Sequence, residues 1–186
     1  MCASLSHITF RDASVLDTLH GYASNKKSGY ERESAAIGFQ SLANVLGPAA
    51  APILLPSLPM LYDLYMDKGE VVRNAATEAV KAILKLFPPE SAGQVFRVLE
   101  SVIEKGKWKA KVGALDGIKS FVKSAKDAVA NELGVTLPKV ELALHDTKAE
   151  VRWICVILSY WRSKLTKHLH RFLQRQPNVR LLCALL

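Results

Sequence analysis

Apolar residues recur along this chain at the three- and four-residue spacing of an α-helix. One such series comprises Val95, Val98, Leu99, Val102 and Ile103. A helix would place these five side chains on one face, where they can pack against a neighbouring helix. Nowhere does the sequence alternate apolar and polar residues as a strand would. The pattern therefore predicts an all-α fold.

Breaker residues divide the pattern into segments. The predicted helices are residues 7–23, 31–46, 54–66, 70–87, the segment between Ser91 and Gly106, 107–125 and 126–144. Gly47-Pro48 and Pro88-Pro89 end two of them, because glycine caps a helix and proline cannot continue one. Ser91 is expected to cap the next helix, and three prolines within 52–59 predict an irregular start to another. The connections are short, which is typical of antiparallel neighbours.

The helical segments repeat. Asp67…Val72-Arg73 recurs at Asp146…Val151-Arg152, 79 residues downstream, which is two periods of about 40 residues. Ala36, Ala76 and Ala114 occupy one register position near the start of three helices. This period is that of HEAT repeats, in which helical hairpins bury their apolar faces only by stacking. We expect a HEAT/armadillo-type right-handed superhelix, an α-solenoid, of about three to four hairpins.

Composition separates the repeats from the C-terminal tail. Residues 1–151 carry 18 Lys and Arg against 17 Asp and Glu, whereas residues 152–186 carry seven basic residues and no acidic one. We therefore predict a HEAT domain over 1–151 and a basic tail over 152–186. The tail is either a non-native extension or an alternative terminus. Three widely spaced cysteines and no run of 18 apolar residues predict a reducing compartment and no transmembrane helix.

The last repeats resemble a known family. Lys107-Trp108, Ala125-Lys126-Asp127, Asp146-Thr147-Lys148 and Glu150-Val151 carry the likeness, which is to the amino-terminal HEAT region of fungal translation elongation factor 3. It extends more weakly upstream to about Ala13. The resemblance implies a cytoplasmic factor whose partner is the ribosome, through rRNA and ribosomal proteins. In that family two downstream cassettes hydrolyse ATP.

For the chain itself the sequence predicts no enzyme, no cofactor and no metal site. The string GYASNKKS (Gly21–Ser28) is Walker-like, but it has Lys26 in place of the second glycine and follows a helix instead of a strand. His168 and His170 have no nearby Cys or carboxylate to complete a metal site. We expect a monomer with neither a membrane partner nor a small-molecule substrate.

Two sets of residues are candidates for a role. The first is basic and comprises Lys105, Lys107, Lys109, Lys111, Lys119, Lys123 and Lys126. It could contact RNA phosphates, or it could be a solvated helix face. The second set comprises Asp67, Arg73, Asp146 and Arg152, for which we predict a structural ladder of Asp–Arg bridges between adjacent repeats. Trp108 is more typical of a packing anchor than of a base-stacking residue.

Three functions remain open. A ribosome-binding module of an elongation factor 3-like protein is the first. A protein-binding HEAT scaffold, as in a translational activator or a transport receptor, is the second. The third is the full ATPase, with this sequence a defective gene model of it. Salt-sensitive binding to RNA would favour the first, and salt-resistant binding to a protein the second.

Overall fold

The computed structural model describes residues 14–124, Thr136 and 146–152. The start of the first predicted helix, most of the segment 126–144, Lys126 and the tail beyond Arg152 lie outside these residues. The two-domain division at residue 151 therefore stays a prediction.

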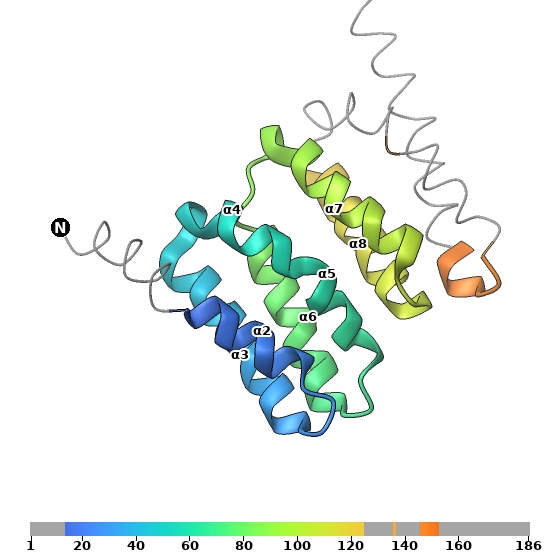
Figure 1. Cartoon of the computed structure of the whole chain (residues 1–186). Helices are drawn as coiled ribbons and strands as arrows, with labels where there is room; N and C mark the ends of the chain where they lie inside the picture. Colours follow the sequence, from blue (N-terminus) through green and yellow to red (C-terminus); the bar gives the residue numbers. More distant parts are fainter. Residues whose placement is uncertain (1–13, 125–135, 137–145, 153–186) are drawn as a thin grey trace, which may run out of the picture.

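The described part of the chain contains helices and no strands. Its elements are α2 (Val15–Ser24), α3 (Gly29–Leu46), η1 (Gly47–Ala50), α4 (Ala51–Leu54), η2 (Leu55–Ser57), α5 (Leu58–Asp63), η3 (Leu64–Met66), α6 (Glu70–Leu84), η4 (Pro89–Ser91), α7 (Ala92–Lys105) and α8 (Trp108–Ser124). Figure 1 shows them as successive helical hairpins laid side by side. A further helical turn begins at Ala149. The predicted all-α solenoid of HEAT type is confirmed.

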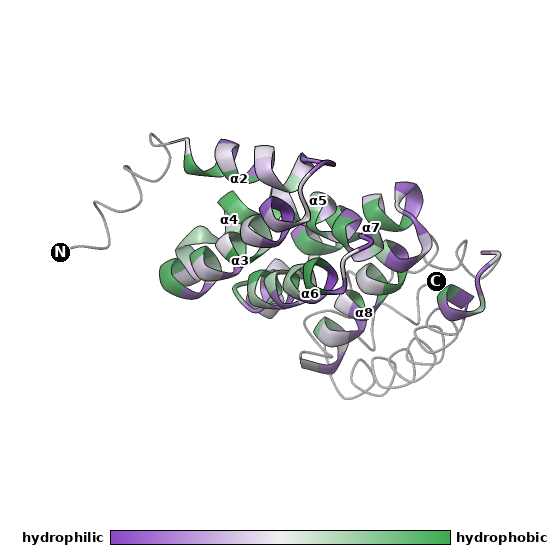
Figure 2. Ribbon diagram, turned by 90° about the horizontal axis from the view of Figure 1, so that it is seen from below, coloured by the Kyte–Doolittle hydropathy of each residue, from purple (hydrophilic) through white to green (hydrophobic). Residues whose placement is uncertain are grey.

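The core lies between the hairpins. α2 packs on α3, α6 packs along α3, and α7 packs on α8. The three register-equivalent alanines, Ala36, Ala76 and Ala114, are each 0% exposed. Small side chains at these points let the helices approach closely, as the repeat pattern predicted. Figure 2 shows hydrophobic residues mainly where the helices face one another and hydrophilic residues along the outer loops.

Most helix ends fall near the predicted breakers. Gly47 follows α3 with φ 62°, a conformation that favours glycine. Gly106 caps α7 as expected. Ser91 stands at the N-cap position of α7 as predicted, but its backbone is at φ −89° and ψ 4° and its side chain makes no capping hydrogen bond. Ser28 is the residue that caps in this way, its Oγ accepting a hydrogen bond from the Glu31 backbone N–H at 3.2 Å.

Two glycines of α8 let it lie close to a pair of tyrosines. A Cβ added at Gly113 would sit 2.5 Å from a ring carbon of Tyr65, and one at Gly117 would sit 3.1 Å from the Tyr62 hydroxyl. α8 thus packs on α5, η3 and α7, whereas it does not run along α6 in the way that α6 runs along α3. Burial raises the pKa of Tyr65 to about 12 and also raises the pKa of Tyr62.

One helical stretch, Gly29–Met66, is long and apolar enough to cross a membrane by length and composition alone. It has 38 residues, and an 18-residue window has a mean hydropathy of 1.4. Core helices of soluble proteins meet the same criterion, and 39% of this window is buried. The stretch includes the break at Gly47, and α3 and α5 on either side of that break both pack on α6. The fold uses this segment as core.

Candidate functional site

The loops that precede the second helix of three hairpins have the same geometry. An Asx side chain accepts a hydrogen bond from the backbone N–H two residues on, at 2.9 Å for Asn25, 2.9 Å for Asp67 and 3.0 Å for Asp146. Such Asx turns fix the direction in which the chain enters the following helix. The predicted repeat of Asp67 and Asp146 is therefore a repeat of one loop structure.

An arginine closes each of these loops. Arg73 Nη1 donates to the carbonyl oxygens of Asp67 and Lys68, at 2.8 and 3.0 Å. Arg152 Nη1 repeats these two bonds, at 2.8 and 3.0 Å, with the carbonyl oxygens of Asp146 and the residue after it. The two arginines therefore hold their own loops, and the bridge between repeats predicted for them is made by other side chains.

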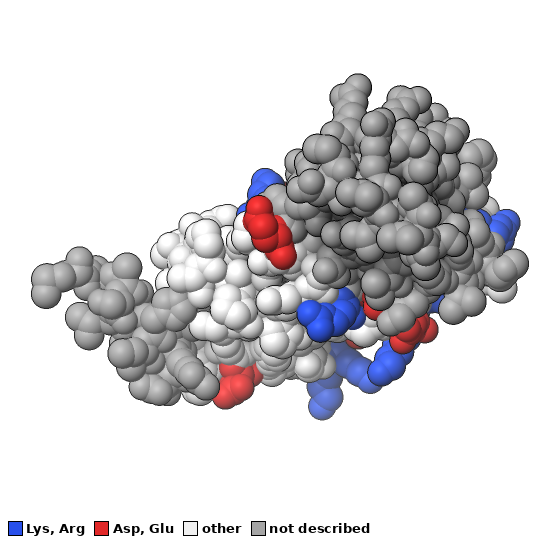
Figure 3. Space-filling view, turned by 90° about the horizontal axis from the view of Figure 1, so that it is seen from above, with Lys and Arg blue, Asp and Glu red and all other residues white. Residues whose placement is uncertain are grey.

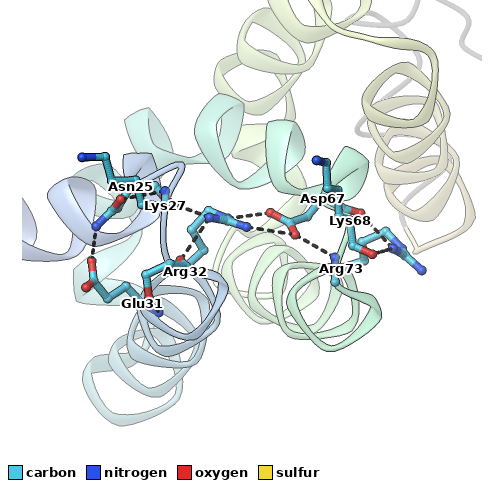
Figure 4. A network of polar contacts seen from close by, with 9 residues as sticks. Asn25, Lys27, Glu31, Arg32, Asp67, Lys68 and Arg73 are labelled. Atoms are coloured by element: carbon cyan, nitrogen blue, oxygen red, sulfur yellow. Dashed lines mark hydrogen bonds and ion pairs between the residues drawn. The ribbon is translucent and has the colours of Figure 1, made fainter.

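The bridges between repeats come from cations 35 residues before each aspartate. Arg32, near the start of α3, donates through Nε and Nη2 to the Asp67 carboxylate at 2.6 and 3.2 Å. Lys111, near the start of α8, donates through Nζ to Asp146 at 2.9 Å. Arg32 also holds its own loop through the Asn25 and Ser28 carbonyl oxygens. Figure 4 shows Arg32 and Asp67 meeting across the gap between α3 and α6. We call these two cross-repeat ion pairs the loop ladder.

Both ladder carboxylates are held in the charged form. The hydrogen bond from Arg32 is the main cause that lowers the pKa of Asp67; burial opposes it less strongly, and the Gly69 N–H adds to the lowering. The Lys148 N–H and then Lys111 do the same for the pKa of Asp146. The side chains of Arg32 and Asp67 are only 15% and 8% exposed. This pair is thus better shielded from water than an ordinary surface salt bridge.

Two of the predicted RNA-contact lysines have acidic partners. Lys111 belongs to the loop ladder, and Lys119 pairs with Asp116 at 3.2 Å, one helical turn away on α8. Their charges are partly compensated within the fold. The structure therefore favours a structural role for Lys111 over the RNA contact predicted for it.

The other predicted lysines lie on more than one element. Lys105 is the last residue of α7, Lys107 lies in the loop after it, and both are exposed. Lys109 Nζ lies 5.5 Å from the ring centroid of Trp108, and Lys123 is exposed near the end of α8. Lys126 lies outside the described residues. Trp108 itself packs against the hydrophobic core, as predicted for an anchor.

Sequence reasoning missed Arg32, the residue that joins the first two hairpins. A signal was present, since Arg32 precedes Asp67 by the same 35 residues that separate Lys111 from Asp146. Within the described residues, no group of three or more His, Cys, Asp or Glu side chains could hold a metal ion.

The stacked hairpins and the repeated Asx–Arg loops define a HEAT-repeat protein. The family model described as the EF3 N-terminal HEAT repeat matches residues 6–153. The chain belongs to this family, and the matched part is a HEAT region of a family named for a translation factor.

Relatives extend this finding. The chain is 39% identical over 150 residues to the mRNA export factor elf1 of Schizosaccharomyces pombe, covering 77% of this chain and 14% of elf1. It is 32% identical to elongation factor 3 of Gonapodya prolifera, covering 72% and 13%. It is 26% identical to the eIF-2-alpha kinase activator GCN1 of Dictyostelium discoideum, covering 77% and 5%. The chain therefore spans only a small part of the length of these relatives.

Proposed function

We propose that this chain is a ribosome-binding HEAT module of an elongation factor 3-like translation factor, acting in the cytoplasm. Its membership of the elongation factor 3 HEAT family is the observation that carries the proposal. ATP hydrolysis, in this proposal, belongs to other parts of a longer protein. The module itself contributes a binding surface and acts as a monomer.

The fold supports a binding role through its rigidity. Stacked repeats contact only their neighbours, and a loop ladder that fixes neighbouring repeats keeps an extended surface in one shape. A preformed surface loses little conformational entropy on binding. Its exposed lysines, Lys105, Lys107 and Lys123, supply charge for a phosphate-rich partner.

Sedimentation of the full chain with purified ribosomes tests the proposal. We expect binding at about 50 mM salt that falls steeply by about 200 mM, because binding to phosphates releases counterions. The chain should sediment with ribosomes and stay in the supernatant without them. Absence of the chain from the ribosome pellet at the lower salt would contradict the proposal.

A protein-binding scaffold is the second candidate, favoured by a separate surface. No charged residue occurs between Ser34 and Tyr62. Figure 3 shows a broad uncharged area on the face seen from above. Val45, in α3, is 82% exposed, and Ile37 is 46% exposed. Exposed apolar side chains on an uncharged segment suit contact with a protein better than contact with phosphates, and the relatives named as a kinase activator and an export factor fit such a role.

The two candidates differ in their response to salt and to substitution. A scaffold would keep its partner at high salt and lose it on Val45→Lys. A phosphate-binding module would lose its partner at high salt and tolerate Val45→Lys. Loss of ribosome binding on Val45→Lys alone would move the assignment to the scaffold.

A further inference from the structure

The third hairpin has a lysine where the hairpins on either side of it have the ladder aspartates, Asp67 and Asp146. Asp67 and Asp146 each stand three residues before the start of the next helix. Each also stands six residues before the arginine that closes its loop, Arg73 or Arg152. In the third hairpin both counts, from the start of α8 and from Lys111, lead to Lys105. The position that carries a carboxylate in the neighbouring repeats is thus occupied by a cation.

This replacement leaves one rung of the ladder open. Arg32 reaches the aspartate of the next repeat, and so does Lys111. Arg73 is the equivalent cation between them, and the register places Lys105 opposite it. Among the described residues Arg73 forms no ion pair, although its charge helps to lower the pKa of Asp67 in its own loop. The repeat register therefore aligns two positive charges at the position where the other rungs pair opposite charges.

Hydrogen bonds to its own loop orient the Arg73 guanidinium. Its Nη1 is fixed by two carbonyl oxygens of its own loop. Figure 4 shows the group on the side of α6 away from the Arg32–Asp67 pair. Because α8 does not pack along α6, the third hairpin does not close on this rung as the second closes on the first. A guanidinium oriented in this way can bind a phosphate through two parallel N–H groups.

Exposed cations surround the open rung. Lys68 and Lys107 lie in the two loops beside it, and Lys105 ends α7; all three are exposed. The acidic residues near them in sequence are Asp67, which is paired with Arg32, and the exposed Glu70 and Glu104. Arg73 is the fourth cation of this group; because Asp67 is already paired with Arg32, the two glutamates leave the group with a net positive charge. Because the cations come from two loops, a chain of anions can engage more of them than a single carboxylate can.

We propose that the open rung is a site for the phosphate backbone of RNA, with one phosphate bridging Arg73 and Lys105 and a neighbouring phosphate on Lys107. The inference rests on the proposed function, because it names the chemistry by which this basic surface would meet a ribosome. Contacts to phosphates carry no base information, so the site binds without sequence preference. It also selects Lys105 and Lys107 from the predicted lysines and sets Lys111 and Lys119 aside.

Fluorescence anisotropy with a labelled single-stranded RNA of about 20 nucleotides tests the site directly. The full chain is compared with Lys105→Asp and with Arg73→Gln. We expect Lys105→Asp to weaken binding about tenfold or more and to reduce the slope of log K against log salt by about one to two. Lys85→Asp is the matched control. Lys85 is also exposed at the end of a helix, α6, and its substitution changes the charge by the same amount. It should weaken binding about twofold at most, through the general field alone.

Urea unfolding of the same variants shows whether a loss of RNA affinity comes from a loss of stability. A carboxylate at position 105 can pair with Arg73, so Lys105→Asp should unfold at a higher urea concentration than Lys85→Asp. Equal losses of RNA affinity in these two variants would overturn the site. Binding of polyglutamate as tightly as RNA would overturn the assignment to phosphate and point to an acidic protein.

Failure of the site and failure of the proposed function give different results. If ribosome binding persists while Lys105→Asp leaves RNA affinity unchanged, the open rung is not the RNA site and the ribosome-binding proposal stands. If the wild-type chain binds RNA through the rung but does not sediment with ribosomes, the site stands and the partner is another RNA-containing particle.

Discussion

At the scale of single residues, Arg32 is the side chain that joins its own loop to the next repeat. Its guanidinium holds its own loop through two carbonyl oxygens and the next repeat through the Asp67 carboxylate. Arg32→Gln removes the charge and leaves a shielded carboxylate with only its Gly69 N–H bond and the more distant charge of Arg73. We expect a loss of about 2–3 kcal/mol in the free energy of unfolding, measured by urea denaturation.

The control for Arg32 is a surface pair. Lys81 and Glu78 are 58% and 55% exposed, and their ion pair spans one turn of α6. Lys81→Gln should change the free energy of unfolding by no more than about 0.5 kcal/mol. A similar cost for both substitutions would show that the shielded ladder pair is no stronger than an ordinary surface pair.

The Asp67 carboxylate also predicts a pH dependence. Its pKa is lower in the folded protein than the ordinary value of 3.8. The stabilisation is therefore fully present above that ordinary value and is lost as pH falls through the lowered pKa of the folded state. We expect the stability difference between wild type and Asp67→Asn to be constant from neutral pH to about pH 5 and to shrink below about pH 4. Urea denaturation across this range measures it, and a difference that persists unchanged to pH 3 would contradict the assignment.

The residues of the ladder were only partly predictable. The recurrence of Asp67 and Arg73 at Asp146 and Arg152 was visible in the sequence, but their partners were not. Spacing within one repeat identifies residues that share a loop, and the structure shows that Arg73 stays within that loop. A bond between repeats depends on how far apart the helices stack, which residue spacing alone does not determine. Only the shared 35-residue separation indicated Arg32.

At the scale of helices, α8 illustrates a conflict between intrinsic propensity and packing. Glycine weakens a helix by about 1 kcal/mol relative to alanine. At Gly113, however, an added Cβ would lie 2.5 and 2.9 Å from the ring carbons of Tyr65. We expect Gly113→Ala to lower the free energy of unfolding by about 1–3 kcal/mol, because the overlap outweighs the gain in propensity. Thermal or urea unfolding measures whether Gly113→Ala lowers or raises the free energy of unfolding.

Gly21 is the matched control, because it also lies inside a helix, α2, and has nothing within 4 Å of an added Cβ. Gly21→Ala should raise the free energy of unfolding by about 0.5–1 kcal/mol. If both substitutions stabilise the protein, the tyrosines can move aside at little cost and the close approach of α8 is not required.

Helix boundaries show which sequence signals are reliable. Gly47 and Gly106 marked helix ends correctly. Few other residues fit the positive φ at Gly47 or the close contacts at Gly106. The prolines in 52–59 correctly indicated an irregular helix, which the structure resolves into short α and 3₁₀ segments. Ser91 failed as a cap because serine accepts such a bond only with an extended backbone, and η4 holds it otherwise.

At the scale of the whole molecule, we expect the hairpins to differ in local stability according to the contacts that each makes with its neighbours. α3 and α6 pack along each other, and Arg32 on α3 bonds to the loop that precedes α6, whereas α8 packs on α7, α5 and η3. In such an array each repeat is stabilised chiefly by the next, so a local defect loosens adjacent helices first.

Hydrogen exchange on the Arg32→Gln variant tests this distribution. Backbone amides of α2 and α3 should exchange faster than in wild type, by a factor that reflects the lost ladder pair, while those of α7 and α8 keep their protection. Gly113→Ala should produce the opposite pattern, with faster exchange in α8 and little change in α2. A uniform increase across all helices in both variants would mean that the hairpins open as one cooperative unit. A graded pattern would instead mean that α2 and α3 can open while α7 and α8 stay folded.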